Sequence, residues 1–182
     1  WFGSDIVDLI ESLSIASCFA PLPVSIKLRS TNSSYEHWSG VRTDRRTSLA
    51  VIEDKSIACR SPLINLRVAA EFVLFISQTG MNRQQATELT MGDFRYEGWQ
   101  DGYMVRRYKG RKRGDVEFEI FSEYRHFFQN YLSFRKAAFP PEFSDLLFPM
   151  IPRLWMPTST IRFNTESLRG FLLGVGRKNI TT

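Results

Sequence analysis

Six cationic side chains occupy eight consecutive positions, and they are Arg106, Arg107, Lys109, Arg111, Lys112 and Arg113. Glycines at 110 and 114 give this run the composition of a turn between two strands. Cations at this density on one hairpin suit contacts with the phosphates of a nucleic acid, whose affinity then falls as salt rises. We therefore predict that these residues bind DNA. The alternative is a charged turn that is only solvated.

A second candidate pair, Asn82 and Arg83, follows Gly80. The planar fork of an arginine can hold two nonbridging oxygens of a phosphate and offset the charge that builds up in a transition state. An asparagine donates hydrogen bonds but carries no charge, and it is also a common helix N-cap. Arg83 is thus a candidate phosphate ligand or an exposed residue of a first helical turn. Asn82 is a candidate DNA contact or an N-cap.

These residues need elements to position them, and the clearest predicted helix spans residues 62–78. Its apolar residues recur at helical spacing, Ser61-Pro62 has the composition of a helix start, and Gly80 that of a helix end. Asn82 then begins a second helix that runs from Arg83 to about Leu89. Gly92-Asp93 ends it.

Beyond residue 94 the apolar pattern changes from helical spacing to alternation. Three alternating segments between about 94 and 121 predict a three-stranded antiparallel sheet. A helix over 122–137 follows, with Phe127, Tyr131 and Phe134 as its core stripe and His126 at the surface, and a last helix is expected over 165–173. The predicted fold class is α+β, with helices packed around a small three-stranded antiparallel sheet.

The first part of the chain has a different composition. Residues 4–17 predict one amphipathic helix with Ser4 as its N-cap, and the polar residues 29–48 predict a linker or exposed loop. We expect two regions: an N-terminal helix with a polar linker segment over 1–60, and a second domain over 61–182.

The order of these elements resembles the catalytic domain of tyrosine recombinases, the phage-integrase family, from about Ser61 to Thr182. Three stretches carry the resemblance, the first of which is in two parts: Phe75-Ile76-Ser77-Gln78-Thr79-Gly80-Met81 with Glu88-Leu89-Thr90-Met91-Gly92-Asp93-Phe94, then Tyr108-Lys109-Gly110-Arg111-Lys112 followed by Val116, then Leu146-Leu147-Phe148-Pro149. The first is similar to the box around the family's first catalytic arginine, and the second to its lysine hairpin. The resemblance implies that the second region is a partial integrase-like catalytic domain.

The resemblance also implies roles for individual residues. Lys109 would be the general acid that protonates the leaving 5′ oxygen, with Lys112 as the alternative if the register is shifted. The family's first arginine usually stands two positions after the turn glycine, where this chain has Asn82. Either Arg83 serves one step later or this arginine is lacking.

The family's His-x-x-Arg box and nucleophilic tyrosine are not found between residues 1 and 182, and the six tyrosines fall elsewhere. The resemblance therefore implies a tyrosine recombinase in the complete protein and an inactive, DNA-binding fragment in these residues. Two other functions stay open: a DNA-binding regulator of helix-turn-helix type, with Arg83 to Phe94 as the motif, and an interaction domain that does not bind DNA.

Composition limits the partners. The 182 residues carry 24 Lys and Arg against 19 Asp and Glu, a formal net charge of +5, which favours an anionic partner such as double-stranded DNA. The two cysteines and two histidines match no zinc spacing, so no metal site is expected. The resemblance implies that no small-molecule cofactor is needed. No membrane span is expected either, and a cytoplasmic location follows as the default for a chain with no leader pattern. The resemblance adds self-association on DNA.

Overall fold

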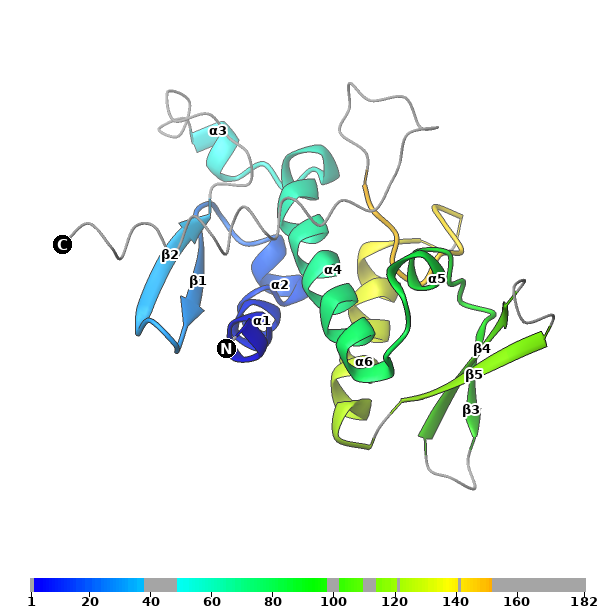
Figure 1. The fold of residues 1–182 in the computed structure, drawn as a ribbon. Helices are drawn as coiled ribbons and strands as arrows, with labels where there is room; N and C mark the ends of the chain where they lie inside the picture. Colours follow the sequence, from blue (N-terminus) through cyan, green and yellow to red (C-terminus); the bar gives the residue numbers. More distant parts are fainter. Residues whose placement is uncertain are drawn as a thin grey trace. The chain divides into compact units, whose positions relative to one another are not determined.

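The computed structural model describes residues 2–37, 49–97, 102–109, 114–120, 122–140 and 142–151. It combines α-helices with antiparallel strands, which confirms the mixed α and β class (Figure 1). The described residues fall into two compact units. The first takes in the chain up to Ala70 together with Met150 and Ile151, and the second runs from Glu71 to Pro149.

The first unit opens with two short helices, α1 (Phe2–Ser12) and α2 (Ile15–Cys18). The prediction of one helix over 4–17 is therefore wrong, because the helix is interrupted at residues 13–14. Ser14 has an extended backbone, and its hydroxyl accepts a hydrogen bond from the amide of Ser17 at 3.1 Å, so it caps a new helix. A serine side chain that bonds to nearby backbone favours helix ends over helix interiors, which explains the break.

A hairpin follows, made of β1 (Val24–Leu28) and β2 (Ser33–His37), which form a two-stranded antiparallel sheet. Val24 pairs with His37 and Leu28 with Ser33, and the residues of β1 alternate between buried and exposed. The predicted linker over 29–48 is thus wrong for its first part. The strand Ser33–His37 is almost entirely polar, so its sequence has no alternation of apolar residues that would predict a strand. Residues 38–48 lie outside the described part.

The next helices are α3 (Leu49–Ile52) and α4 (Ile57–Thr79). The start predicted at Ser61-Pro62 is wrong, because α4 begins at Ile57 and continues through Pro62. Ser56 provides the cap instead: its hydroxyl accepts from the amide of Cys59 at 3.3 Å. The domain boundary expected after residue 60 lies within this continuous helix.

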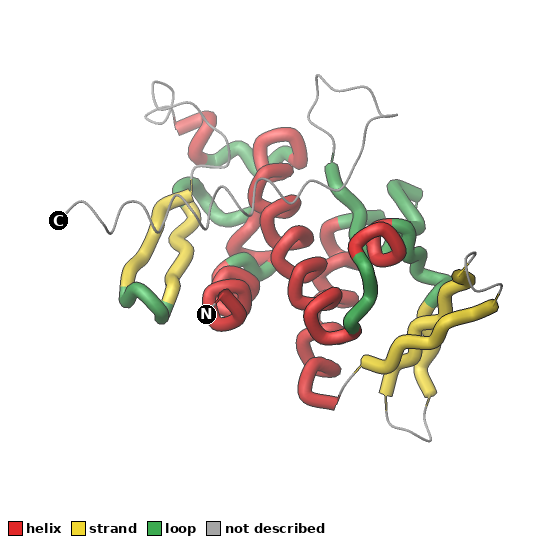
Figure 2. Tube along the Cα trace, viewed as in Figure 1, coloured by secondary structure: helices red, strands yellow, loops and turns green. Residues whose placement is uncertain are grey.

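The second unit contains the end of α4, the short helix α5 (Arg83–Thr87), three strands and α6 (Ser122–Ala138). The strands β3 (Phe94–Glu97), β4 (Gly102–Lys109) and β5 (Gly114–Ile120) are among the yellow segments of Figure 2. They pair antiparallel in the order β3-β4-β5. Their backbone register sets which of their residues share a face.

Aromatic side chains form the core of the second unit. The rings of Phe72 and Phe75, on α4, contact that of Phe148 with centroids 5.4 and 5.1 Å apart, and Tyr131 stacks on Phe148 at 5.0 Å. The predicted stripe on α6 needs one correction. Phe127 is only half-buried, and the buried positions of this helix are Tyr124, Phe128, Tyr131, Phe134, Arg135 and Ala138.

None of the helices in the described part of the chain combines the length and the apolar character that a membrane crossing needs. The helix expected over 165–173 lies outside the described residues.

Candidate nucleic-acid interface

The hairpin of β4 and β5 carries three of the six clustered cations on strand β4. Arg106 is the register partner of Glu117, Arg107 of Val116, and Lys109 of Gly114. Because successive residues of a strand belong to opposite faces of a sheet, Arg107 and Lys109 share one face and Arg106 belongs to the other. The three cations on β4 thus do not share one face of the sheet.

Register also sorts the acidic residues. Arg106 lies on the face that we call the acidic face, which comprises Arg95, Glu97, Met104, Arg106, Tyr108, Asp115, Glu117 and Glu119. Four carboxylates and two guanidinium groups belong to it. Arg106 therefore belongs to the face that is rich in acidic residues, and its direct partner across the strands is Glu117.

Arg107 and Lys109 lie on the opposite face, which we call the apolar face. Its other members are Phe94, Tyr96, Tyr103, Val105, Val116, Phe118 and Ile120, with Gly114 at the turn. Ile120 is buried, so this face is covered at the end far from the turn. Among the paired residues of this face that the structure describes, only Arg107 and Lys109 are charged, and both lie at the turn end. Residues 110–113 lie outside the described part, so the predicted contacts Arg111, Lys112 and Arg113 have no described position.

The second predicted element, Asn82-Arg83, begins α5. Gly80 precedes it with a φ of +66°, a conformation that suits glycine at the end of α4. Both polar atoms of the Asn82 side chain form hydrogen bonds within the helix cap. Its Oδ1 accepts from the amide of Gln85 at 2.9 Å, and its Nδ2 donates to Oε1 of the same residue at 2.6 Å. Arg83 is exposed in the first turn. The expectation of an N-cap at Asn82 is confirmed.

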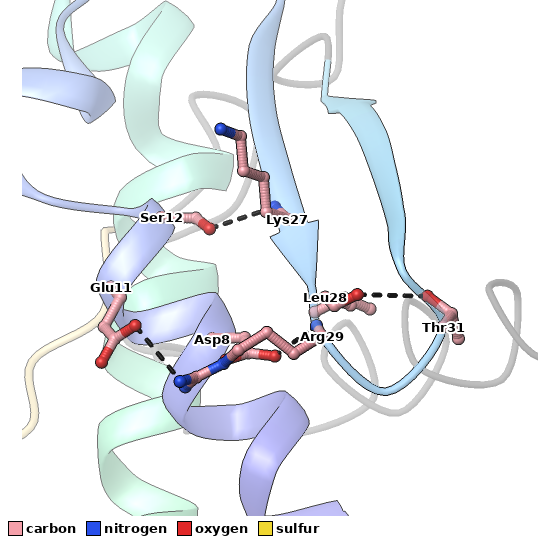
Figure 3. Close-up of polar contacts among 7 residues, drawn as sticks. All are labelled: Asp8, Glu11, Ser12, Lys27, Leu28, Arg29 and Thr31. Atoms are coloured by element: carbon pink, nitrogen blue, oxygen red, sulfur yellow. Dashed lines mark hydrogen bonds and ion pairs between the residues drawn. The ribbon is translucent and has the colours of Figure 1, made fainter.

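Several charged residues that the sequence did not single out have structural partners. In the first unit Asp8 is buried and accepts from the backbone amide of Arg29 at 2.6 Å and from its Nε, while Glu11 lies 3.6 Å from its Nη2 (Figure 3). These bonds hold Arg29 to α1. They also raise the pKa of Arg29, first through the hydrogen bond with Asp8.

Arginines also lie inside the protein. Arg60 is 0% exposed and donates to the carbonyl of Ile52, and Arg67 is 5% exposed and donates to the carbonyls of Ile10 and Leu13. Both cap the C-terminal carbonyls of helices that precede α4. One feature of the sequence indicates their burial: they stand seven residues apart, on the apolar side of α4.

Metal and thiol chemistry find little support in the described residues. Across them, no three His, Cys, Asp or Glu side chains gather closely enough to hold a metal ion. Burial raises the pKa of the Cys18 thiol to about 12, so it stays protonated and unreactive at neutral pH.

Comparisons of the chain with protein-family models, with curated proteins and with solved structures found no match.

Proposed function

We propose that this chain binds double-stranded DNA through the turn end of the β4–β5 hairpin, and that it does so as part of a recombinase-like strand-exchange protein. The observation that supports DNA binding best is the register of the hairpin. It gives Arg107 and Lys109 partners without carboxylates and assigns the acidic residues of β5 to the other face.

Separation of charge is what makes such a hairpin fit for phosphates. A cation opposite a carboxylate must exchange one partner for another when DNA arrives, so little free energy is gained. A cation without such a partner releases condensed counterions from the DNA, and each contact then steepens the dependence of affinity on salt. Arg107 and Lys109 meet this condition better than Arg106.

The end of α4 and the start of α5 provide the second proposed contact. Asn82 uses both polar atoms of its side chain within the cap, whereas Arg83 is exposed beside it. Of the two residues left open by the sequence, Arg83 is therefore the better phosphate ligand. Its planar fork also suits two oxygens of one phosphate.

The recombinase part of the proposal rests on the resemblance around these same residues. In that scheme Lys109 protonates the leaving 5′ oxygen in the complete protein, with Lys112 as the alternative, and copies of the protein assemble on DNA. Lys109→Ala should then slow cleavage by about 100-fold, and a 5′-thio leaving group should restore much of the rate, because it needs little protonation. Normal cleavage by this variant, with a slow and thio-rescued Lys112→Ala, would move the role to Lys112.

A helix-turn-helix regulator is less well supported. The helix α5 has five residues and a length of roughly 7.5 Å, about one and a half turns. A recognition helix must present three or four side chains to the bases of the major groove, which needs more helix than this.

The direct test is the affinity of the purified chain for a labelled duplex between about 50 and 200 mM salt. Six contacts at about 0.9 each predict a log–log slope of roughly −5.4, with similar affinities for unrelated sequences. The six are Arg83, Arg107, Lys109, Arg111, Lys112 and Arg113. A poly-glutamate of equal charge is the control for binding to any polyanion. Weak binding of DNA that does not respond to salt would reject the proposal in favour of an interaction domain of another kind.

A further inference from the structure

The chain that leaves α5 is held by a segment from much later in the sequence. Leu147 donates its backbone amide to the carbonyl of Leu89 at 2.7 Å, and Met91 donates to the carbonyl of Asp145 at 2.8 Å. Thr90 and Leu146 lie opposite each other in this short antiparallel bridge. Residues 89–91 therefore depend on residues 145–147 for their position.

Two side chains of α6 hold the later segment in turn. Arg135 is 5% exposed and donates from Nε to the carbonyl of Leu146 at 2.9 Å, and from Nη2 to the carbonyls of Ser144 and Leu146 at 2.7 and 2.6 Å. Tyr131 donates its hydroxyl to the carbonyl of Leu147 at 2.6 Å. The two residues stand four apart and so share one side of α6.

Contacts closer in the sequence also hold residues 89–91. Asp93 accepts from the amide and the hydroxyl of Thr90 at 2.7 and 2.9 Å. Ala86 and Leu89 are fully buried, so they anchor the inner side of α5. A helix of five residues has little stability of its own, and its direction is set by such anchors.

We propose that Arg135 is a positioning residue for Arg83. It holds the carbonyls of residues 144 and 146, these fix the bridge to residues 89–91, and the bridge fixes the α5 helix from which Arg83 is exposed. Arg135 is buried and does not itself touch DNA. The role of Arg83 in DNA binding rests on the function proposed above. The link from Arg135 to the position of α5, which we call the mechanical part, does not.

Arginine suits this position for a geometric reason. Its Nε and Nη2 reach two carbonyls in a fixed fork, and three hydrogen bonds result. A lysine has a single nitrogen and cannot hold the same pair of carbonyls in one plane. Arg135→Lys should therefore rescue the position only in part.

Amide hydrogen exchange tests the mechanical part without DNA. In Arg135→Gln we expect the amides of Met91 and Leu147 to exchange at least about tenfold faster, while amides within α4 keep their protection. Lys136→Gln is the matched control, since Lys136 is the exposed neighbour on the same helix. Unchanged protection of Met91 and Leu147 in Arg135→Gln would overturn the proposal.

Tyr131→Phe keeps the proposal testable if Arg135→Gln fails to fold. It removes one hydroxyl from the clamp, by which we mean the hydrogen bonds of Arg135 and Tyr131 to residues 144–147, and leaves the aromatic ring on Phe148. We expect faster exchange at Leu147 in this variant, by a smaller factor. If Arg135→Gln does not fold and Tyr131→Phe leaves Leu147 fully protected, the clamp does not position the bridge and the proposal fails.

DNA affinity completes the test through a double-mutant cycle. Arg83→Ala should weaken binding by roughly tenfold at low salt, and Arg135→Gln by a similar or smaller factor. The double variant should bind no more weakly than Arg83→Ala, because both changes remove the same contact. Fully additive losses would overturn the link from Arg135 to Arg83. If Arg83→Ala binds like the unaltered chain, the phosphate contact of Arg83 fails, and hydrogen exchange still decides the mechanical part.

Discussion

The cations of the two hairpins have different partners. Arg29 follows β1 and is bound by the carboxylate of Asp8, with Glu11 nearby, so its charge serves to hold the first hairpin to α1. In the second hairpin Arg107 and Lys109 have Val116 and Gly114 as register partners. Residue types alone do not separate these cases. The partners do: a carboxylate accepts hydrogen bonds from Arg29, whereas the register partners of Arg107 and Lys109 carry none.

The first hairpin is also closed along the outer edge of β1. The amide of Lys27 donates to the hydroxyl of Ser12 at 3.1 Å and that of Arg29 to Asp8, so side chains of α1 occupy donors that a further strand would use (Figure 3). We conclude that the first hairpin is part of the core of its unit. The second hairpin is the one proposed to meet an external partner.

The largest effect is expected at the turn of the second hairpin. Replacing Arg111, Lys112 and Arg113 together by Ala removes three proposed phosphate contacts, so the salt slope should become less steep by roughly 2.7 and all duplex sequences should bind more weakly. Fluorescence anisotropy with two unrelated duplexes measures both. Binding equal to that of the unaltered chain would show that the turn is only solvated.

A smaller effect is expected when the first hairpin loses its buried carboxylate. Asp8→Asn removes the charge that accepts two hydrogen bonds from Arg29, and the free energy of unfolding should fall by about 2 kcal/mol. Urea unfolding followed by circular dichroism measures this. DNA affinity of the folded variant should stay the same.

Glu11→Gln provides the matched control for Asp8. Glu11 is 60% exposed and its oxygen lies 3.6 Å from Arg29, so the loss should be well under about 1 kcal/mol. Equal losses for the two variants would mean that burial does not distinguish these carboxylates.

The smallest effect concerns pH. Burial lowers the pKa of His37, which lies at the end of β2. Between its ordinary pKa and the lower, folded value, His37 is therefore protonated in the unfolded chain and neutral in the folded chain. The stability that neutral His37 contributes is present above about pH 6.5 and is lost as the pH falls through the lower, folded value. His37→Gln should flatten the fall of the urea midpoint between about pH 7.5 and 5.5. His126→Gln, on the exposed side of α6, is the control, and an equal flattening there would contradict the assignment.

Local patterns in the sequence predicted local features well. The helix expected over 122–137 is observed as Ser122–Ala138, Gly80 has the positive φ of a helix end, and Asn82 caps α5. Each of these depends on residues within a few positions of one another. Propensity, capping and apolar spacing are sufficient in such cases.

Features that depend on distant residues were missed. The strand Ser33–His37 is visible only through its pairing with β1, and Arg135 matters only because residues 144 and 146 return to it. The sorting of Arg106 and Arg107 onto different faces requires the register, since a slip by one residue would exchange them. The cation count at the candidate site could be read from the sequence, but its arrangement could not.

A comparison of the two faces of the second hairpin tests whether register decides which cations bind DNA. Arg107→Ala with Lys109→Ala removes both cations of the apolar face, and the salt slope of DNA binding should become less steep by roughly 1.8. Arg106→Ala changes a residue whose register partner is Glu117, and its slope should match that of the unaltered chain. If Arg106→Ala loses as much slope per cation as the double variant, or if the double variant keeps the full slope, register does not decide which cations bind DNA.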